Sequence, residues 1–210
     1  MKLIETPHGE ARLEAHPAED PFVTLLLSHG AGGGIEARDL QALATGLPEH
    51  GASVVLLEQP WRRAGRKIAT APPTLDAALV AAVAALDVGT PLVVGGRSAG
   101  ARSATRTASG VGAVGCLALS FPLHPPGRPE RSRAAELAGS GVPTLVVQGA
   151  NDAMGRPEEF PDDLDHVAMS VVPGGDHGLK VAKASGLSAE DVAAIVVEST
   201  LEWLVREVGT

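Results

Sequence analysis

Residues 95–100, Gly-Gly-Arg-Ser-Ala-Gly, join an apolar strand predicted over Leu92–Val94 to a helix predicted to begin near Ala99. They contain a G-x-S-x-G pattern with Ser98 at its centre. A serine on such a sharp turn needs strained backbone angles and close neighbours, which glycine permits. The N-terminus of the following helix would direct free N–H groups toward the hydroxyl. The pattern predicts a nucleophilic Ser98, and the alternative is a glycine-rich turn that contains a serine by chance.

Apolar runs on either side of this turn predict the sheet to which it belongs. An opening hairpin is expected from Leu3–Thr6 and Ala11–Ala15, which flank a Pro-His-Gly turn. Continuous apolar runs, typical of parallel strands buried on both faces, follow at Phe22–Leu27, Ser53–Leu57, Gly115–Leu119, Thr144–Val147 and Val167–Val172. Because helical patterns separate these runs, we expect an α/β fold with about eight mostly parallel strands and about six helices on both faces.

The clearest helical pattern covers Leu75–Leu86, where apolar residues recur at the spacing of one buried helix face. Thr74, directly before it, is the expected N-cap. Ser188, followed by Asp191 three residues later, predicts a capped final helix that ends near Glu207. No stretch between the predicted elements is long enough for a separate lid, so we expect a shallow, open site.

The composition fits one globular domain over residues 1–210. Chains split into separate domains only beyond roughly 250–300 residues. The residues are 44% hydrophobic but only 2% aromatic, so the core must consist mainly of Val, Leu, Ala and Ile. The 25 glycines and 16 prolines indicate many turns and argue against a helix bundle.

Charge and cysteine content exclude several classes of protein. The net charge of −8 argues against binding to nucleic-acid phosphates, which requires an excess of Lys and Arg. The single cysteine, Cys116, fits a reducing compartment and is expected to be a small core residue. No apolar run approaches the ~20 residues that span a bilayer, and the N-terminus lacks the apolar stretch of a signal peptide. We therefore expect a cytoplasmic protein with no membrane partner, and the sequence makes no prediction of its oligomeric state.

The predicted strand Phe22–Leu27 leads into the segment Ser-His-Gly-Ala-Gly-Gly-Gly, residues 28–34. In a sheet of this type, a His-Gly segment with further glycines after an early strand is where a second oxyanion donor lies. The backbone N–H groups of Ala31 and Ala99 are therefore the predicted oxyanion hole. A dinucleotide-binding loop is the alternative, but Ile35 stands at the last glycine position of that fingerprint. No cofactor is expected.

Two further loops that follow predicted strands supply an acid and a base. Asp152 comes after Thr144–Val147, and His177 comes after Val167–Val172. Taken alone, Asp152 could be a turn former and His177 a solvated surface group. Together with Ser98 they follow the order Ser, Asp, His in which nucleophile-elbow hydrolases carry their triad, and all three lie at the same edge of the sheet. We predict that His177 accepts the Ser98 proton and that Asp152 orients the imidazole.

Other polar residues near these loops have smaller predicted roles. Asp176 is a poor orienting acid for His177, because neighbours in a chain rarely face each other correctly. Side chains predicted to bind the substrate, all just after strands, are His29, Trp61, Arg97 and His124. No group of His, Cys, Asp and Glu has the spacing of metal ligands, so no metal is expected.

At these residues the sequence resembles the α/β-hydrolase superfamily. It is most similar to a small lidless group that includes dienelactone-hydrolase-like proteins and the hydrolase-like NSL-complex-subunit and testis-expressed proteins. The stretches that carry the resemblance are LSHGAGGG (27–34), GGRSAGAR (95–102), LSFPLHPPG (119–127), VPTLVVQGANDAMG (142–155) and PGGDHGLK (173–180). The resemblance implies a lidless α/β-hydrolase fold and triad roles for Ser98, Asp152 and His177.

The chain also departs from known branches of that superfamily. Dienelactone hydrolases carry Cys at the nucleophile position, and dehalogenases and epoxide hydrolases carry Asp, whereas this chain carries Ser98. Some members of the most similar group act within protein assemblies without established chemistry. Two interpretations follow: a serine hydrolase that cleaves small esters or thioesters through an acyl-serine, and a catalytically silent interaction module. The complete set of Ser, Asp and His favours the enzyme.

Basic residues are concentrated near the predicted site although the chain is acidic overall. Ten of the 17 lie in, or just beyond, loops that follow strands: Arg62, Arg63, Arg66, Lys67, Arg97, Arg102, Arg128, Arg131, Arg156 and Lys180. One hypothesis is a cationic rim that attracts an anionic ester substrate. The alternative, which we expect, is solvated pairing of little energetic value with acidic residues of the same region. These acidic residues are Glu130, Glu158, Glu159 and Asp162.

Overall fold

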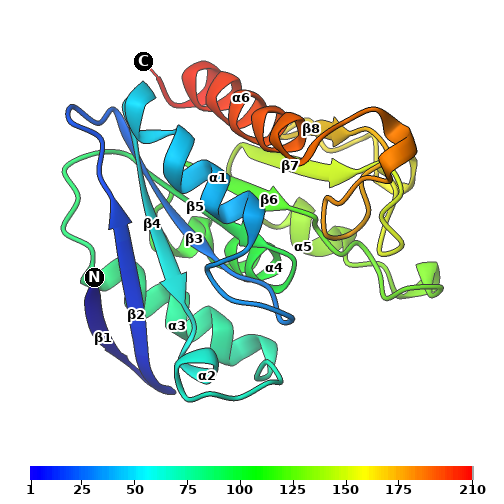
Figure 1. Ribbon diagram of the computed structural model, residues 1–210. Helices are drawn as coiled ribbons and strands as arrows, with labels where there is room; N and C mark the ends of the chain where they lie inside the picture. The colour runs from blue at the N-terminus through cyan, green and yellow to red at the C-terminus, as the bar shows by residue number, and fades with distance from the viewer. Residues whose placement is uncertain (210) are drawn as a thin grey trace.

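The computed structural model describes residues 1–209, which contain one eight-stranded sheet (Figure 1). The strands are β1 (Lys2–Thr6), β2 (Gly9–His16), β3 (Val23–Ser28), β4 (Ala52–Glu58), β5 (Leu92–Arg97), β6 (Gly115–Leu119), β7 (Thr144–Gly149) and β8 (Val167–Val172). Their order across the sheet is β1-β2-β4-β3-β5-β6-β7-β8. β2 pairs antiparallel with β1 and β4, and the other neighbours are parallel. The predicted α/β class, opening hairpin and mostly parallel sheet are confirmed.

Helices cover both faces of the sheet, as expected. They are α1 (Arg38–Gly46), α2 (Pro60–Arg63), α3 (Pro72–Ala85), α4 (Ala99–Thr107), α5 (Ala134–Ala138) and α6 (Ala189–Glu207). α1 and α6 pack together on one face, and α3 and α4 pack together on the other (Figure 1). In the part of the chain that the structure describes, no helix is both long and apolar enough to cross a bilayer.

Alternate residues of the central strands point to opposite layers. Leu25 and Leu27 of β3 join the core beneath α1 and α6, whereas Leu26 joins the core beneath α3 and α4. Val93 and Val94 of β5 divide in the same way. Because a strand has a period of two and both faces are covered, side chains on both faces are buried and most positions are apolar, although Thr24 and Ser28 of β3 are buried polar residues. This explains the continuous apolar runs in the sequence.

Two strands continue two or more residues beyond their predicted carboxyl ends. β5 continues from the predicted Leu92–Val94 to Arg97, and β7 ends two residues later than predicted. At Gly95 a side chain would place its Cβ 2.6 Å from the carbonyl oxygen of Leu117 on β6. The glycine in β5 therefore permits close approach of neighbouring backbones within the strand instead of ending it.

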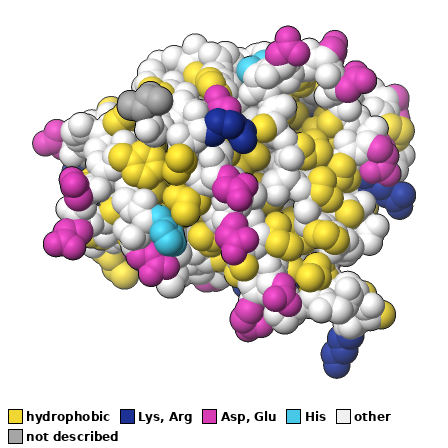
Figure 2. All heavy atoms as spheres, turned by 90° about the horizontal axis from the view of Figure 1, so that it is seen from above, with side chains coloured by type: hydrophobic (Ala, Val, Ile, Leu, Met, Phe, Trp, Pro, Cys, Tyr) yellow, Lys and Arg dark blue, Asp and Glu magenta, His cyan; other side chains and the backbone are white. Residues whose placement is uncertain are grey.

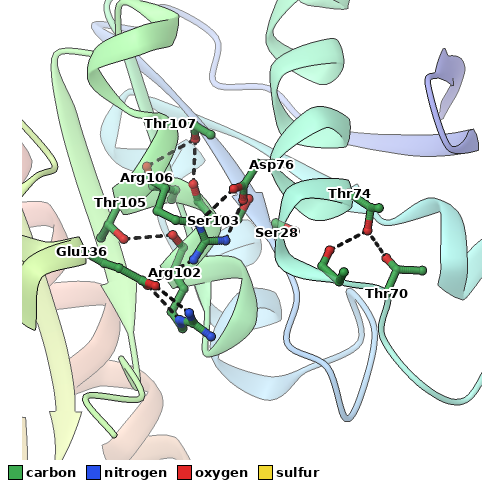
Figure 3. Close-up of polar contacts among 12 residues, drawn as sticks. Ser28, Thr70, Thr74, Asp76, Arg102, Ser103, Thr105, Arg106, Thr107 and Glu136 are labelled. Atoms are coloured by element: carbon green, nitrogen blue, oxygen red, sulfur yellow. Dashed lines mark hydrogen bonds and ion pairs between the residues drawn. The ribbon is translucent and has the colours of Figure 1, made fainter. Parts of the chain in front are cut away.

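The predicted N-cap at Thr74 is wrong. α3 begins at Pro72, its N-cap is Ala71, and no side chain caps it. The Thr74 hydroxyl instead donates to the Ala71 carbonyl at 2.7 Å and lies against the hydroxyl of Thr70 (Figure 3). Proline suits the first helical position because its fixed φ is already helical and its missing N–H would have no intrahelical partner there. The prolines therefore start the helix before the threonine.

Two other local predictions are confirmed. Ser188 caps α6 by accepting from the Asp191 N–H at 3.1 Å, and the Asp191 carboxylate accepts from the Ser188 N–H at 2.7 Å. Cys116 is fully buried in β6, and burial raises the pKa of its thiol to about 12. A thiol in this environment stays protonated and acts as a small core side chain.

Four charged side chains tie α4 to the helices beside it (Figure 3). Arg106 donates twice to Asp76 of α3, at 2.9 and 2.7 Å. Arg102 donates twice to Glu136 of α5, at 2.8 and 2.6 Å, and Arg106 also contacts Glu136 at 3.1 Å. Paired, planar contacts of this kind restrict orientation as well as distance. The network therefore anchors the helix that begins directly after Ser98.

Replacing Arg106 with alanine is expected to lower the free energy of unfolding by about 1–3 kcal/mol, because two half-buried carboxylates lose their shared partner. Urea denaturation followed by circular dichroism measures the change. The matched control is Arg128→Ala, since Arg128 is exposed and forms no ion pair within residues 1–209. Its expected change is below about 0.5 kcal/mol. Equal effects of the two substitutions would show that the network does not stabilise the fold.

Candidate active site

Ser98 occupies the turn between β5 and α4 with φ 52° and ψ −108°. Residues other than glycine rarely adopt a positive φ. A Cβ at Gly96 or Gly100 would lie 2.2 or 2.3 Å from the carbonyl oxygen of Ser28. Both positions therefore exclude any side chain, which accounts for the spacing of the two glycines. The Ser98 N–H donates to the Leu119 carbonyl at 2.9 Å, so the turn is also held by β6.

The structure brings together the three residues predicted as a triad. Ser98 Oγ lies 3.0 Å from His177 Nε2, and His177 Nδ1 lies 2.8 Å from Asp152 Oδ2. The Asp152 side chain is fully buried, whereas the His177 side chain is 28% exposed. A carboxylate beside Nδ1 requires a proton on that nitrogen, so Nε2 is free to accept the proton of the serine hydroxyl. This is the arrangement that a general base needs.

Asp152 has two supporting contacts besides His177. Its Oδ1 accepts from the Met154 N–H at 2.7 Å, and its Oδ2 accepts from the Gln148 side-chain amide at 2.9 Å. The same Gln148 nitrogen lies 2.8 Å from the Gly155 carbonyl, which closes the loop around the carboxylate. Sequence analysis assigned no role to Gln148. The feature of the sequence that could have indicated a role for Gln148 is its place as a polar residue at the end of an otherwise apolar strand.

The turn that carries His177 is held by Asp176. Asp176 Oδ1 accepts from the backbone N–H groups of Gly178 at 2.7 Å and Lys180 at 2.9 Å. Leu179 in this turn has a φ of 53°. Because the Asp176 carboxylate binds its own backbone, it does not face the imidazole of its neighbour. The orienting carboxylate in the structure is that of Asp152.

The glycine-rich loop after β3 lies against the nucleophile turn. A Cβ at Gly30 would lie 3.3 Å from the Cβ of Ser98. Ala31 is exposed, and Ala99 is the first residue of α4, where N–H groups have no acceptor inside the helix. The two predicted oxyanion donors therefore lie on segments next to Ser98, and their role stays a prediction.

His29 positions this loop and has no ring nitrogen free for a substrate, which corrects its predicted binding role. The Gln59 N–H donates to His29 Nε2 at 3.0 Å, so Nδ1 carries the proton and donates to the Gly30 carbonyl at 2.9 Å. His29 is only 1% exposed, and burial lowers its pKa. A neutral imidazole thus joins the glycine-rich loop to the end of β4.

Trp61 and His124 also support loops. Trp61 is buried on α2, where its ring meets that of His29 edge to face at 5.4 Å. His124 is buried, with Nδ1 2.9 Å from the Pro125 carbonyl and Nε2 3.3 Å from the Glu159 carboxylate. The sequence prediction that these two side chains bind substrate is not supported by their contacts.

Arg97, the fourth predicted binding residue, makes two hydrogen bonds within the protein. Its Nε donates to Asp39 at 2.7 Å and its Nη2 to the His177 carbonyl at 2.8 Å. Asp39, which sequence analysis missed, is buried near the start of α1. The only feature of the sequence that could have indicated Asp39 is its place as an acidic residue in the first turn of a helix.

The predicted partners of the basic residues are wrong. Four of the ten form ion pairs, but with other carboxylates: Arg62 with Glu36, Arg63 with Glu10, Arg97 with Asp39, and Arg102 with Glu136. Within the 209 described residues, the remaining six form no ion pair. Figure 2 shows acidic and hydrophobic side chains spread over the α1 and α6 face, with few Lys or Arg. The basic residues are therefore absent from most of this face.

A cavity of about 380 Å³ lies between the glycine-rich loop, the start of α1 and the His177 turn. Its lining includes Gly33, Arg38 and Lys180. A larger cavity of about 520 Å³ is lined by Met1, Pro17 and Thr90, at the amino ends of the parallel strands. Ligands of open α/β sheets bind at the carboxyl ends. The smaller cavity is therefore the better candidate for substrate. Among the residues described, no cluster of three or more His, Cys, Asp or Glu could hold a metal ion.

A family model described as an alpha/beta hydrolase domain matches residues 21–205. No curated protein matches the sequence significantly. An α/β serine hydrolase homologue from Coxiella burnetii superimposes with a TM-score of 0.75 at 18% identity, over 94% of this chain and 95% of that one.

Two further solved structures share the architecture. A lidless α/β serine hydrolase from Xanthomonas campestris gives a TM-score of 0.71 at 19% identity, over 96% of this chain and 93% of that one. A dienelactone hydrolase from Anabaena variabilis gives a TM-score of 0.76 at 15% identity, over 99% of this chain and 96% of that one. At these identities the likeness establishes the fold alone. The narrower resemblance to NSL-complex-subunit and testis-expressed proteins stays a prediction.

Proposed function

The chain belongs to the alpha/beta hydrolase domain family, and from this premise we propose that it is a serine hydrolase of small carboxylic esters or thioesters. The observation that carries the proposal is the unbroken hydrogen-bond chain from Ser98 through His177 to Asp152, at 3.0 and 2.8 Å. The strained φ of Ser98 adds support, because such strain persists where function requires it. An interaction module would need neither feature.

The geometry suits an acyl-serine mechanism. Ser98 Oγ attacks the substrate carbonyl carbon while its proton passes to His177 Nε2, and the buried Asp152 stabilises the imidazolium. The N–H groups of Ala31 and Ala99 stabilise the negative charge on the carbonyl oxygen. The bond to the leaving group breaks, and His177 returns the proton to the departing alcohol or thiol.

A second half-reaction regenerates the enzyme. His177 removes a proton from water, the resulting hydroxide attacks the acyl-serine, and the acid is released as Ser98 recovers its proton. No step requires a metal or an organic cofactor. The names of the structural relatives, serine hydrolases and a dienelactone hydrolase, support hydrolysis as the reaction class.

The site suits small or flexible substrates. The cavity of about 380 Å³ that lies beside it, lined by residues next to Ser98 and His177 in the chain, is bounded by surface loops, and the Xanthomonas relative is described as lidless. Arg38 and Lys180 line this cavity and form no ion pair within the described residues, which supports the proposal that one preferred substrate carries an anionic group. A cytoplasmic location, suggested by the single Cys116, belongs to the same proposal.

A neutral fluorophosphonate probe tests the function. We expect covalent modification of the Ser98 peptide, located by mass spectrometry, together with turnover of short-chain nitrophenyl esters and thioesters. A carboxylate-bearing ester of equal size tests the anionic preference at low salt, where attraction is strongest. A folded protein that neither reacts with the probe nor turns over any ester of the panel would instead be a catalytically silent module.

A further inference from the structure

Arg97 connects three parts of the candidate site through one side chain. It is the last residue of β5 and directly precedes Ser98. Its Nε donates to Asp39 on α1, and its Nη2 donates to the backbone carbonyl of His177. Within the described part of the chain, this bond and the Ser98–His177 contact are the only hydrogen bonds between residues 95–100 and the turn at 173–180.

Asp39 fixes the direction of the Arg97 guanidinium. The Asp39 side chain is 5% exposed, and its Oδ1 accepts from the Leu40 N–H at 2.9 Å. Burial raises the pKa of Asp39, and the adjacent guanidinium opposes this change. A buried carboxylate without a cation is costly, so the pair stays together. Because a guanidinium is planar, holding its Nε at Asp39 directs its Nη2 toward the His177 carbonyl.

The turn that carries His177 has few other connections to the nucleophile. Asp176 fixes the internal shape of this turn. The Asn151 N–H donates to the Gly175 carbonyl at 2.8 Å, which ties the turn to the loop that carries the acid. Neither contact reaches β5. Arg97 therefore supplies the hydrogen bond that sets the distance between the His177 backbone and the strand that ends beside Ser98.

We propose that Arg97, oriented by Asp39, is a positioning residue that holds His177 Nε2 within hydrogen-bond distance of Ser98 Oγ. The inference rests on the proposed hydrolase function, since it concerns the base of that reaction. Proton transfer requires close alignment, and a displacement of about 1 Å can cost ~10²-fold in rate. Arg97 acts through the backbone of His177 and not on the reacting atoms.

Two substitutions at Arg97 separate geometry from charge. Arg97→Met removes both hydrogen bonds, and Arg97→Lys keeps the charge without the planar fork. We expect both to lower kcat for a neutral ester by about 10- to 100-fold, with KM changed less than about threefold. Full wild-type kcat in Arg97→Met would overturn the inference, because neither hydrogen bond would then be needed.

Two further variants test whether a loss of stability, and not a loss of positioning, lowers kcat. The double substitution Asp39→Leu with Arg97→Met removes the buried charge as well, so it should fold but keep the low kcat. Arg102→Met is the matched single control, because the Arg102 and Arg97 side chains are equally exposed, at 21%, and each is ion-paired. We expect Arg102→Met to retain kcat within about threefold.

The outcomes distinguish this inference from the proposed function. If wild-type protein reacts with the fluorophosphonate and the Asp39→Leu, Arg97→Met variant reacts at the same rate, the positioning role is wrong and the hydrolase proposal stands. If folded wild-type protein neither reacts with the probe nor hydrolyses esters, the hydrolase proposal is wrong and the inference fails with it. A selective loss of kcat in the Arg97 variants supports both.

Discussion

Replacing Ser98 with alanine is expected to lower kcat for a neutral ester by roughly 10⁶-fold, the scale of loss when a triad serine is removed. Without Oγ, no acyl intermediate forms, and His177 Nε2 loses the partner that lies 3.0 Å away. Remaining activity would come only from the oxyanion donors and substrate binding. Labelling by the fluorophosphonate should disappear completely. Stopped-time ester assays and intact-protein mass spectrometry measure the two effects.

The matched control for this substitution is Ser103→Ala. Ser103 lies on α4, is fully buried, and has no hydrogen-bond partner for its hydroxyl within residues 1–209. Removing this hydroxyl should therefore leave kcat within about threefold and should not weaken the fold. Ser98→Ala protein that keeps more than about 1% of the wild-type kcat would contradict the proposed role of Ser98, since triad serines account for far more.

Replacing Asp152 with asparagine is expected to lower kcat by roughly 10⁴-fold while the fold is kept. Asp152 Oδ2 accepts from both His177 Nδ1 and the Gln148 amide. With Oδ1 still accepting from Met154, an asparagine presents its NH₂ to the imidazole. His177 would then carry its proton on Nε2, which faces Ser98 and can no longer accept. The serine hydroxyl would keep its proton.

Gln148 keeps its orientation in the Asp152→Asn variant. Its Nε2 also donates to the carbonyl oxygens of Gly155 at 2.8 Å and Phe121 at 3.3 Å, and a rotated amide would turn its own oxygen toward both of them. The substitution therefore removes one acceptor of Gln148 and leaves the other two in place. The neutral-ester assay measures the loss of kcat, and circular dichroism checks that the variant keeps its fold.

Asp176→Asn provides the matched control, because it removes the same charge one residue from His177. Its side-chain oxygen can still accept from Gly178 and Lys180, and the expected change in kcat is less than about fivefold. Equal losses in the two variants would indicate that general electrostatics, and not the tautomer, accounts for the effect.

Local sequence patterns were sufficient to predict the strands and helices that depend on neighbouring residues alone. Apolar runs predicted the strands because side chains alternate between two covered faces, as Leu26 and its neighbours do. The order of Ser98, Asp152 and His177 was sufficient to place them at one edge, because parallel strands end on the same side of the sheet. The wrong N-cap prediction at Thr74 arose because two local signals competed. Pro72 and Pro73 occupy the first positions of the helix, which therefore begins before Thr74.

The contacts between side chains on different elements could not be predicted from such patterns. Asp39, Arg97 and His177 are joined across 58 and 80 residues of sequence, and Arg62, Arg63 and Arg102 found carboxylates on other elements. His29 became a loop support and not a binding group. Such contacts depend on how helices pack on the sheet and how loops lie over its edge. A pattern of three or four residues predicts which positions are buried and which backbone angles they adopt. The partner of a buried charged side chain depends instead on which helix or strand packs against it.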